Sequence, residues 1–190
     1  GGEDGKYGIE GYFQKKTEYV NYGWRIMNDR KLKIGIIGVG KISELHVPGY
    51  MAHPNAEIVA VCDNNESNIQ TRAKNWGYKY SYNNYRDLID NDEVDVVDII
   101  TPHNLHAEMA IYALQNNKHV TLQKPMAINV SECQKIIKAA KNTEKRFRVF
   151  ENFRFYPPLI KAKQILDSGE IGEPISIRMK AIQGTLKYGW

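Results

Sequence analysis

Residues 33–43 read KIGIIGVGKIS, and this stretch decides the fold. Its first half is a short apolar run ending in glycine, which is typical of a β-strand buried on both faces. Its second half has the spacing of a phosphate-binding turn. In such a turn Gly38 makes the tight bend, Gly40 lets the backbone approach a pyrophosphate, and a small third residue allows close packing of helix on strand. Ser43 takes the third position, where glycine or alanine is usual.

Outward from this stretch, strands and helices alternate. Strands are expected at 33–38, 57–62, 78–80, 94–100, 119–122 and 146–151. Helices are expected from about Lys41, with a disturbance near Pro48 and Gly49, and at 66–76, 85–89, 105–115 and 130–141. Parallel neighbours need a crossover connection, so this order predicts βαβ units. The fold class is therefore α/β, with a doubly wound Rossmann-type parallel sheet.

Two details of these helices are also predicted. Gly77 should cap the end of the helix at 66–76, because glycine adopts the left-handed backbone that helix ends need. The helix at 130–141 should turn one apolar stripe toward the core, formed by Val130, Cys133, Ile137 and Ala140.

Three parts are expected along the chain. Residues 1–30, rich in glycine and tyrosine, form an extension of unknown role, and residues 31–150 form the Rossmann domain. Residues 151–190 begin a second α/β domain, which is incomplete in this chain, with an amphipathic helix at 157–167 and a strand near 175–179.

Composition excludes several classes of protein. Hydrophobic residues make up 42% of the chain, which argues against disorder, and no apolar run reaches the ~20 residues of a membrane span. Cys62 and Cys133 are too few for a disulfide framework and lack metal-ligand spacing, so a reducing cytoplasm without a bound metal is expected. The basic residues between Lys135 and Arg148 are interpreted as a solvated helix face, not a nucleic-acid site.

Ligands of doubly wound sheets bind at the carboxyl ends of the strands. There, Lys41 and Ile42 open the first helix, whose N–H groups can bind phosphate. Asp63, 25 residues after Gly38, is placed to accept the ribose hydroxyls and to repel a 2′-phosphate. Asn64 follows where an NADP enzyme would be expected to have arginine, so NAD is predicted over NADP. A purely structural turn is the alternative for Asp63.

Five motifs occur in a characteristic order: GVGKIS followed by His46, VDIITPHNLH at 97–106, NNKHVTLQKP at 116–125, NFRFYPP at 152–158 and SGEIGEP at 168–174. Through them the chain from about Lys31 to Trp190 resembles the Gfo/Idh/MocA family of glucose-fructose oxidoreductase and inositol dehydrogenase relatives. The resemblance implies an NAD(P)-dependent dehydrogenase that acts on CH–OH groups of a sugar, cyclitol or sugar derivative. It also implies a homo-oligomer for the full-length parent.

Site residues follow from the same resemblance. Lys124 matches the lysine of the family's Glu-Lys-Pro motif, which lies near the nicotinamide and the reacting carbon, and is the predicted catalytic residue. Gln123 stands where glutamate is more frequent, and its amide is expected to bond the ribose or nicotinamide. The cofactor cleft would be lined by Thr101, Pro102 and His106, and Arg154 would begin the wall on its substrate side. A cis Lys124–Pro125 peptide is a further expectation.

One departure from the family is large. Its members carry an Asp-x-x-x-His motif, whose histidine is the acid/base, on the second domain, and no such motif occurs here. Two interpretations stay open. The chain is either the N-terminal portion of a longer enzyme, or a shortened NAD(H)-binding module without turnover.

Overall fold

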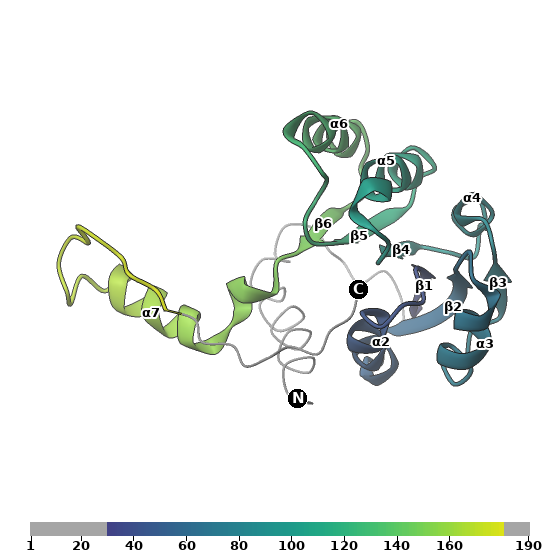
Figure 1. Cartoon of the computed structure of the whole chain (residues 1–190), viewed down its shortest axis with the longest axis horizontal. Helices are drawn as coiled ribbons and strands as arrows, with labels where there is room; N and C mark the ends of the chain where they lie inside the picture. The colour runs from purple at the N-terminus through teal and green to yellow at the C-terminus, as the bar shows by residue number, and fades with distance from the viewer. Residues whose placement is uncertain (1–29, 181–190) are drawn as a thin grey trace. The chain divides into compact units, whose positions relative to one another are not determined.

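The computed structural model describes residues 30–180, shown in colour in Figure 1. Nearly all of the predicted N-terminal extension therefore lies outside the described residues, as do residues 181–190. The chain divides between Asn152 and Phe153 into two compact units. Within residues 30–180, no helix is both long and apolar enough to cross a bilayer.

The first unit is built on a six-stranded sheet. Its strands are β1 (Leu32–Ile37), β2 (Ala56–Cys62), β3 (Tyr80–Tyr82), β4 (Val96–Ile99), β5 (His119–Gln123) and β6 (Phe147–Phe150). They lie in the order β3-β2-β1-β4-β5-β6, and every pair is parallel. The strand β1 lies at the centre of the sheet, β2 and β3 follow on one side, and the chain then crosses to the other side for β4, β5 and β6. This order confirms the predicted doubly wound Rossmann fold.

Helices cover both faces of the sheet (Figure 1). One face packs against α2 (Ser43–Ala52) and α3 (Glu66–Arg72), and the other against α4 (Tyr85–Ile89), α5 (His106–Gln115) and α6 (Val130–Lys141). Alternating side chains of the central strands supply the two cores: Ile34 and Ile36 face α2 and α3, whereas Val97 and Ile99 face the other layer. Two short 3₁₀ helices lie at His103–Leu105 and Asn152–Phe155.

Local expectations fail at two helices. Pro48 does not disturb α2, which runs through it. Pro48 and Glu44 are both exposed, so water can bind the carbonyl that the proline leaves without a donor. The helix α3 ends at Arg72, not at residue 76, and Gly77 instead takes a positive φ of 75° in the turn that follows. Trp76 packs against the core beside α3. The chain leaves the helix axis after Arg72 because this side chain turns into the core.

The apolar stripe predicted for α6 is only partly right: Ala140 packs against the core, but two of the other predicted residues do not. Ile136 is fully buried, whereas Val130 and Ile137 are exposed. The side that faces α5 is therefore centred on Ile136, with Ala139 and Ala140 packed against the same core. The periodicity of the sequence predicts an amphipathic helix. The packing of this helix against α5 determines which of the adjacent Ile136 and Ile137 is buried.

The described part of the second unit is small. It contains α7 (Pro157–Asp167), which has proline in its first turn, where the missing N–H costs nothing. The strand predicted near 175–179 is absent from residues 171–180, and Ile175 is fully exposed there. A strand needs a neighbour for its backbone hydrogen bonds, and the described chain offers this segment none.

Candidate functional site

The turn between β1 and α2 contains two glycines with different physical roles. Gly38 has φ 96°, and a Cβ there would lie 2.5 Å from the carbonyl oxygen of Ile100. The fold itself therefore requires glycine at this position. A Cβ on Gly40 would meet no atom of residues 30–180 within 4 Å. The space beside Gly40 is thus not needed for packing and is open to a ligand.

Ser43 and the first helical residues shape the same turn. The buried Ser43 hydroxyl donates a 2.5 Å hydrogen bond to the carbonyl oxygen of Gly40. Among residues 30–180, no group accepts a hydrogen bond from the N–H groups of Gly40, Lys41 and Ile42. The helix α2 also has no side-chain cap. Three free donors at the positive end of a helix, beside an open space, suit an anion such as a pyrophosphate.

Asp63 follows the end of β2 and faces this turn. Its carboxylate accepts hydrogen bonds from the backbone N–H of Val39 and of Asn65, each at 2.8 Å, and from the Asn68 amide at 3.2 Å. A carboxylate has about four acceptor positions, so one remains for a ligand hydroxyl. Asn64 beside it is exposed. The structure thus brings Asp63 to the glycine turn and also gives it the structural role that was the alternative.

The thiol of Cys62, the residue before Asp63, is unreactive in the folded chain. Cys62, the last residue of β2, is 2% exposed. Burial, and then the nearby Asp63 and Asp87 carboxylates, raise the pKa of this thiol to about 12. Cys62 therefore stays a packed, protonated side chain at the edge of the site.

The segment after β4 is held by a histidine. His106 is fully buried, with its Nδ1 2.8 Å from the carbonyl oxygen of Pro125 and its Nε2 2.9 Å from that of Thr101. The prediction that His106 lines the cleft needs correction, because its ring has no free surface. It instead joins the segments that follow β4 and β5. Thr101 is half-buried and Pro102 is exposed, so both remain available to a ligand.

Lys124 lies at the carboxyl end of β5 with its side chain exposed, and the Lys124–Pro125 peptide is cis, as predicted. The preceding Gln123 is half-buried and already hydrogen-bonded on both atoms of its amide. Arg154 belongs to the second unit, and its side chain lies outside what the structure describes.

A buried polar group on α2 and β4 was missed by sequence reasoning. Asp98 is fully buried and accepts hydrogen bonds from His46 Nδ1 at 2.9 Å, the Tyr50 hydroxyl at 3.0 Å and the Thr121 hydroxyl at 3.0 Å. A signal was present, since an aspartate inside the apolar run of β4 needs partners to offset its desolvation. No sequence pattern identifies those partners.

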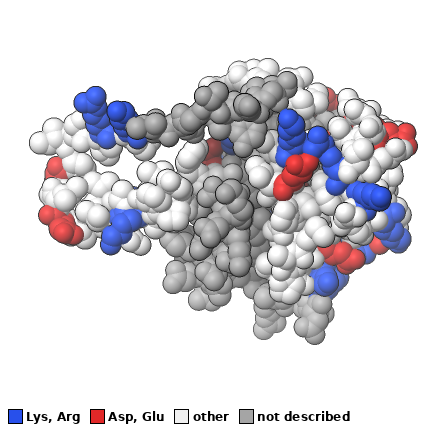
Figure 2. Space-filling model, turned by 60° about the horizontal axis from the view of Figure 1, so that its bottom comes forward, with Lys and Arg blue, Asp and Glu red and all other residues white. Residues whose placement is uncertain are grey.

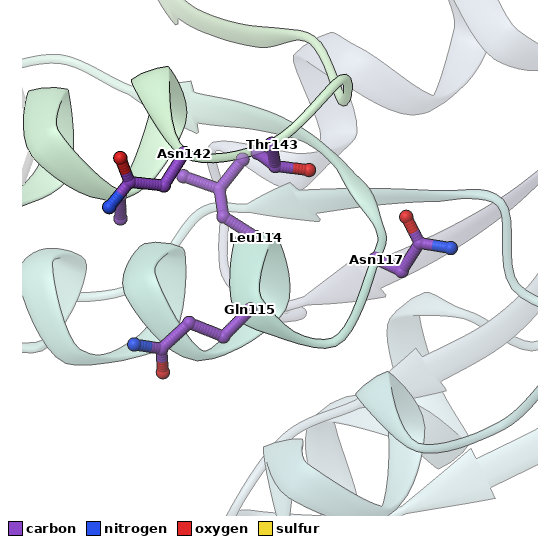
Figure 3. Close-up of a pocket in the computed structure, with 6 residues that line it drawn as sticks. Leu114, Gln115, Asn117, Asn142 and Thr143 are labelled. Carbon is purple, nitrogen blue, oxygen red and sulfur yellow. The ribbon is translucent and has the colours of Figure 1, made fainter.

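A hollow among the described residues lies elsewhere. It has a volume of about 290 Å³ and is bounded by the last turns of α5 and α6 and the residues after them (Figure 3). These helix ends lead into β5 and β6, so the hollow is at the amino edge of the sheet. Ligands of this fold bind at the other edge, which excludes the hollow as the cofactor site.

Charge on the surface forms no single basic face in the view of Figure 2, where acidic residues lie among the basic ones. The described residues also contain no group of three or more His, Cys, Asp or Glu side chains placed to bind a metal ion.

Comparison with known proteins agrees with this geometry. The model of the Gfo/Idh/MocA family, described as an oxidoreductase family with an NAD-binding Rossmann fold, matches residues 32–151. Inositol 2-dehydrogenase of Salmonella typhimurium is 36% identical over 149 residues, which are 77% of this chain and 44% of that protein. A glycosyl hydrolase family 109 protein of Shewanella woodyi is 31% identical over 153 residues, covering 76% of this chain and 33% of its own length.

A solved structure shows the same likeness. The WlbA dehydrogenase of Bordetella pertussis, crystallised with NADH and UDP-GlcNAcA, superposes with a TM-score of 0.73 at 28% identity. The match covers 77% of this chain and 42% of that one. This chain therefore spans less than half the length of the relatives it matches.

Proposed function

The chain belongs to the Gfo/Idh/MocA oxidoreductase family, and from this premise we propose that it is the dinucleotide-binding part of a dehydrogenase. The proposed substrate is a CH–OH group of a sugar, cyclitol or sugar derivative. Support for this class comes from the names of the Salmonella and Bordetella relatives, both dehydrogenases.

The observation that carries the proposal is the arrangement around Gly40. Its missing side chain leaves an open space, which is bordered by three N–H groups without an acceptor among residues 30–180, and the Asp63 carboxylate lies at one end of the turn. A pyrophosphate fits the free donors and a ribose hydroxyl fits Asp63. These residues would hold a dinucleotide at the carboxyl ends of the strands, the edge of the sheet that also carries Thr101 and Lys124.

We propose NAD as the cofactor and NADP as the weaker ligand. A 2′-phosphate would lie against the Asp63 carboxylate, which has no free donor to offer it. Asn64, the next residue, is exposed and uncharged.

Lys124 is proposed as the catalytic residue. NAD supplies the hydride acceptor when it is bound. The Lys124 ammonium would donate a hydrogen bond to the substrate hydroxyl oxygen and stabilise the negative charge that grows there as the C–H bond breaks. The base that takes the hydroxyl proton is expected from the part of the relatives that this chain does not span. Arg154 is proposed to line the substrate side.

Titration of the chain with NADH and NADPH, followed by the fluorescence of the reduced nicotinamide, tests the cofactor proposal. Absence of saturable NADH binding would contradict it. Activity is tested on the natural protein by NAD reduction with myo-inositol, free sugars and nucleotide sugars. Binding without turnover would favour the non-catalytic module. Release of an aryl leaving group from a glycoside, with no net change in NADH, would favour the reaction named for the Shewanella relative.

Two wider properties are also proposed. Cys62 and Cys133 are both free, which suits the reducing cytoplasm. The full-length protein is expected to be a homo-oligomer that binds a small sugar-like substrate, with no nucleic acid or membrane partner. Sedimentation of the natural protein tests the oligomer.

A further inference from the structure

A continuous series of hydrogen bonds connects the buried Asp98 carboxylate to the backbone of Lys124. It runs from Asp98 Oδ2 to His46 Nδ1 at 2.9 Å, and from His46 Nε2 to Gln123 Nε2 at 3.0 Å. It ends at Gln123 Oε1, which accepts the Lys124 N–H at 2.7 Å. The first three members lie on different elements, His46 on α2, Asp98 on β4 and Gln123 on β5, and Lys124 directly follows Gln123 in the chain.

The backbone N–H at one end determines every donor and acceptor in the series. Lys124 N–H can only donate, so Gln123 must present its oxygen to it and its NH₂ to His46. His46 Nε2 must then accept, and the ring proton must lie on Nδ1. That proton is donated to Asp98, which also accepts hydrogen bonds from the hydroxyls of Tyr50 and Thr121. Every hydrogen bond of the series is satisfied when Asp98 acts as the acceptor and the His46 ring carries its proton on Nδ1, with none on Nε2.

The surroundings make this series rigid. His46 is 8% exposed and Asp98 is fully buried, so water cannot easily replace either partner. The Phe150 ring meets the His46 ring edge-on, with ring centroids 4.8 Å apart and planes at 77°. A buried carboxylate that loses a donor is costly, so the members stay together.

Resting on the proposed catalytic role of Lys124, we propose that Asp98, His46 and Gln123 form a positioning series. It holds the backbone of Lys124, and Gln123 selects the neutral Nδ1–H form of His46. The side chain of Lys124 is exposed, but the hydrogen bonds of the series connect its backbone to the buried centre of the sheet. His46, Asp98 and Gln123 act through Lys124 and need not touch the substrate.

The first test is the ¹⁵N spectrum of the histidines in the 190-residue chain without ligand. His46 should show a protonated Nδ1 and a bare Nε2. In Gln123→Glu the new carboxylate still accepts the Lys124 N–H and also requires a donor from His46, so both ring nitrogens should carry protons. A wild-type ring protonated on Nε2, or a Gln123→Glu ring with a bare Nε2, would overturn the proposal.

The second test measures hydrogen exchange of the Lys124 amide. Exchange should accelerate about 10-fold or more in Gln123→Ala and in His46→Ala, and stay slow in Gln123→Glu, which keeps the acceptor. Lys118→Met is the matched control, because it removes another buried polar side chain, bonded to Asn91 and Val94 carbonyls at the opposite edge. It should lower stability without altering Lys124 exchange. If His46→Ala does not fold, the two Gln123 variants still test the proposal. Unchanged exchange of the Lys124 amide in Gln123→Ala would refute the positioning series.

A third measurement separates this proposal from the proposed function. In the natural protein His46→Ala should lower kcat about 10-fold or more and leave the Kd for NADH within about 3-fold, because a misplaced ammonium affects the transition state. An inactive wild type would contradict the proposed dehydrogenase function. The positioning series would then be tested by the ¹⁵N spectra and the hydrogen exchange alone. An active enzyme with unchanged kcat in His46→Ala would contradict the positioning series alone.

Discussion

The backbone N–H of Val39 donates a 2.8 Å hydrogen bond to the carboxylate of Asp63. Val39 lies between the two glycines of the turn after β1, and Asp63 follows β2, so one side chain holds two adjacent strand ends in register. The same carboxylate is proposed to bind the ribose. Substituting Asp63 should therefore alter both the shape of the turn and the choice of cofactor.

The unmodified chain should bind NADH more tightly than NADPH, and Asp63→Ala should narrow the difference. The difference between the binding free energies of NADH and NADPH should shrink by about 1–3 kcal/mol, the usual scale for an unpaired hydrogen-bonding group. Paired titrations with both nucleotides measure it. Asp92→Ala is the control, because it removes an equal charge from an exposed position on the loop before β4. Equal affinities of the wild type for both nucleotides would refute the assignment.

Gly38 and Gly40 should respond oppositely to substitution. Gly38→Ala places a Cβ 2.5 Å from the Ile100 carbonyl at a positive φ and should cost about 1–3 kcal/mol of the free energy of unfolding. The Cβ of Gly40→Val meets no atom of residues 30–180 within 4 Å, so this variant should leave stability within about 0.5 kcal/mol while filling the ligand space and abolishing NADH binding. Thermal unfolding and NADH titration of both variants check this. Normal NADH affinity in Gly40→Val would place the pyrophosphate elsewhere.

Lys124→Met in the natural protein should lower kcat about 10²-fold or more, with NADH affinity roughly unchanged. The ammonium is exposed and acts on charge that develops in the transition state, so fold and cofactor binding do not depend on it. Steady-state kinetics and NADH titration measure the two effects. Lys135→Met, on the exposed side of α6, is the matched control. An unchanged kcat would return Lys124 to a structural role.

Glu93 should make stability depend on pH in the acid range. Its carboxylate binds Lys79 at 2.8 Å, the Tyr80 hydroxyl, and Lys33 at 2.9 Å, and these bonds lower its pKa to about 2 from the usual 4.5. A carboxylate with a depressed pKa in the folded state stabilises fully above its unfolded pKa and loses that effect as the pH falls. The Tm advantage of wild type over Glu93→Gln should thus be constant above about pH 5 and shrink between pH 4.5 and 2. A difference that does not vary over that range would contradict the ion cluster.

The two cysteines should differ in reactivity. Burial raises the pKa of Cys62 to about 12, whereas Cys133 is only partly buried. At pH 8 an alkylating reagent should modify Cys133 first and reach Cys62 only on unfolding, because the thiolate is the reactive form. Peptide mass spectrometry of timed samples, with Cys133→Ser as the control, measures this. Rapid modification of Cys62 in the folded chain would show that β2 opens locally.

Much of the site follows from short-range pattern. The strand before Gly38, the turn to Ser43 and the acid after β2 are encoded by apolar runs, glycine spacing and a strand-end position. These signals are local, since a glycine with φ 96° and a helix N-terminus depend on a few consecutive residues. Strand order follows as well, because parallel pairing and right-handed crossovers leave few alternatives.

Tertiary structure alone decided which residues meet. Ile136 displaced Val130 and Ile137 from the core because α6 docks on α5 with one of two similar apolar sides. His46, Asp98 and Gln123 are 52 and 25 residues apart in succession, and no periodicity relates an α2 residue to positions on β4 and β5. The need of Asp98 for partners is visible in the sequence, because a buried charge must be paired. Which side chains supply the pairing depends on how α2 lies across the sheet, and that is set by the packing of the whole unit.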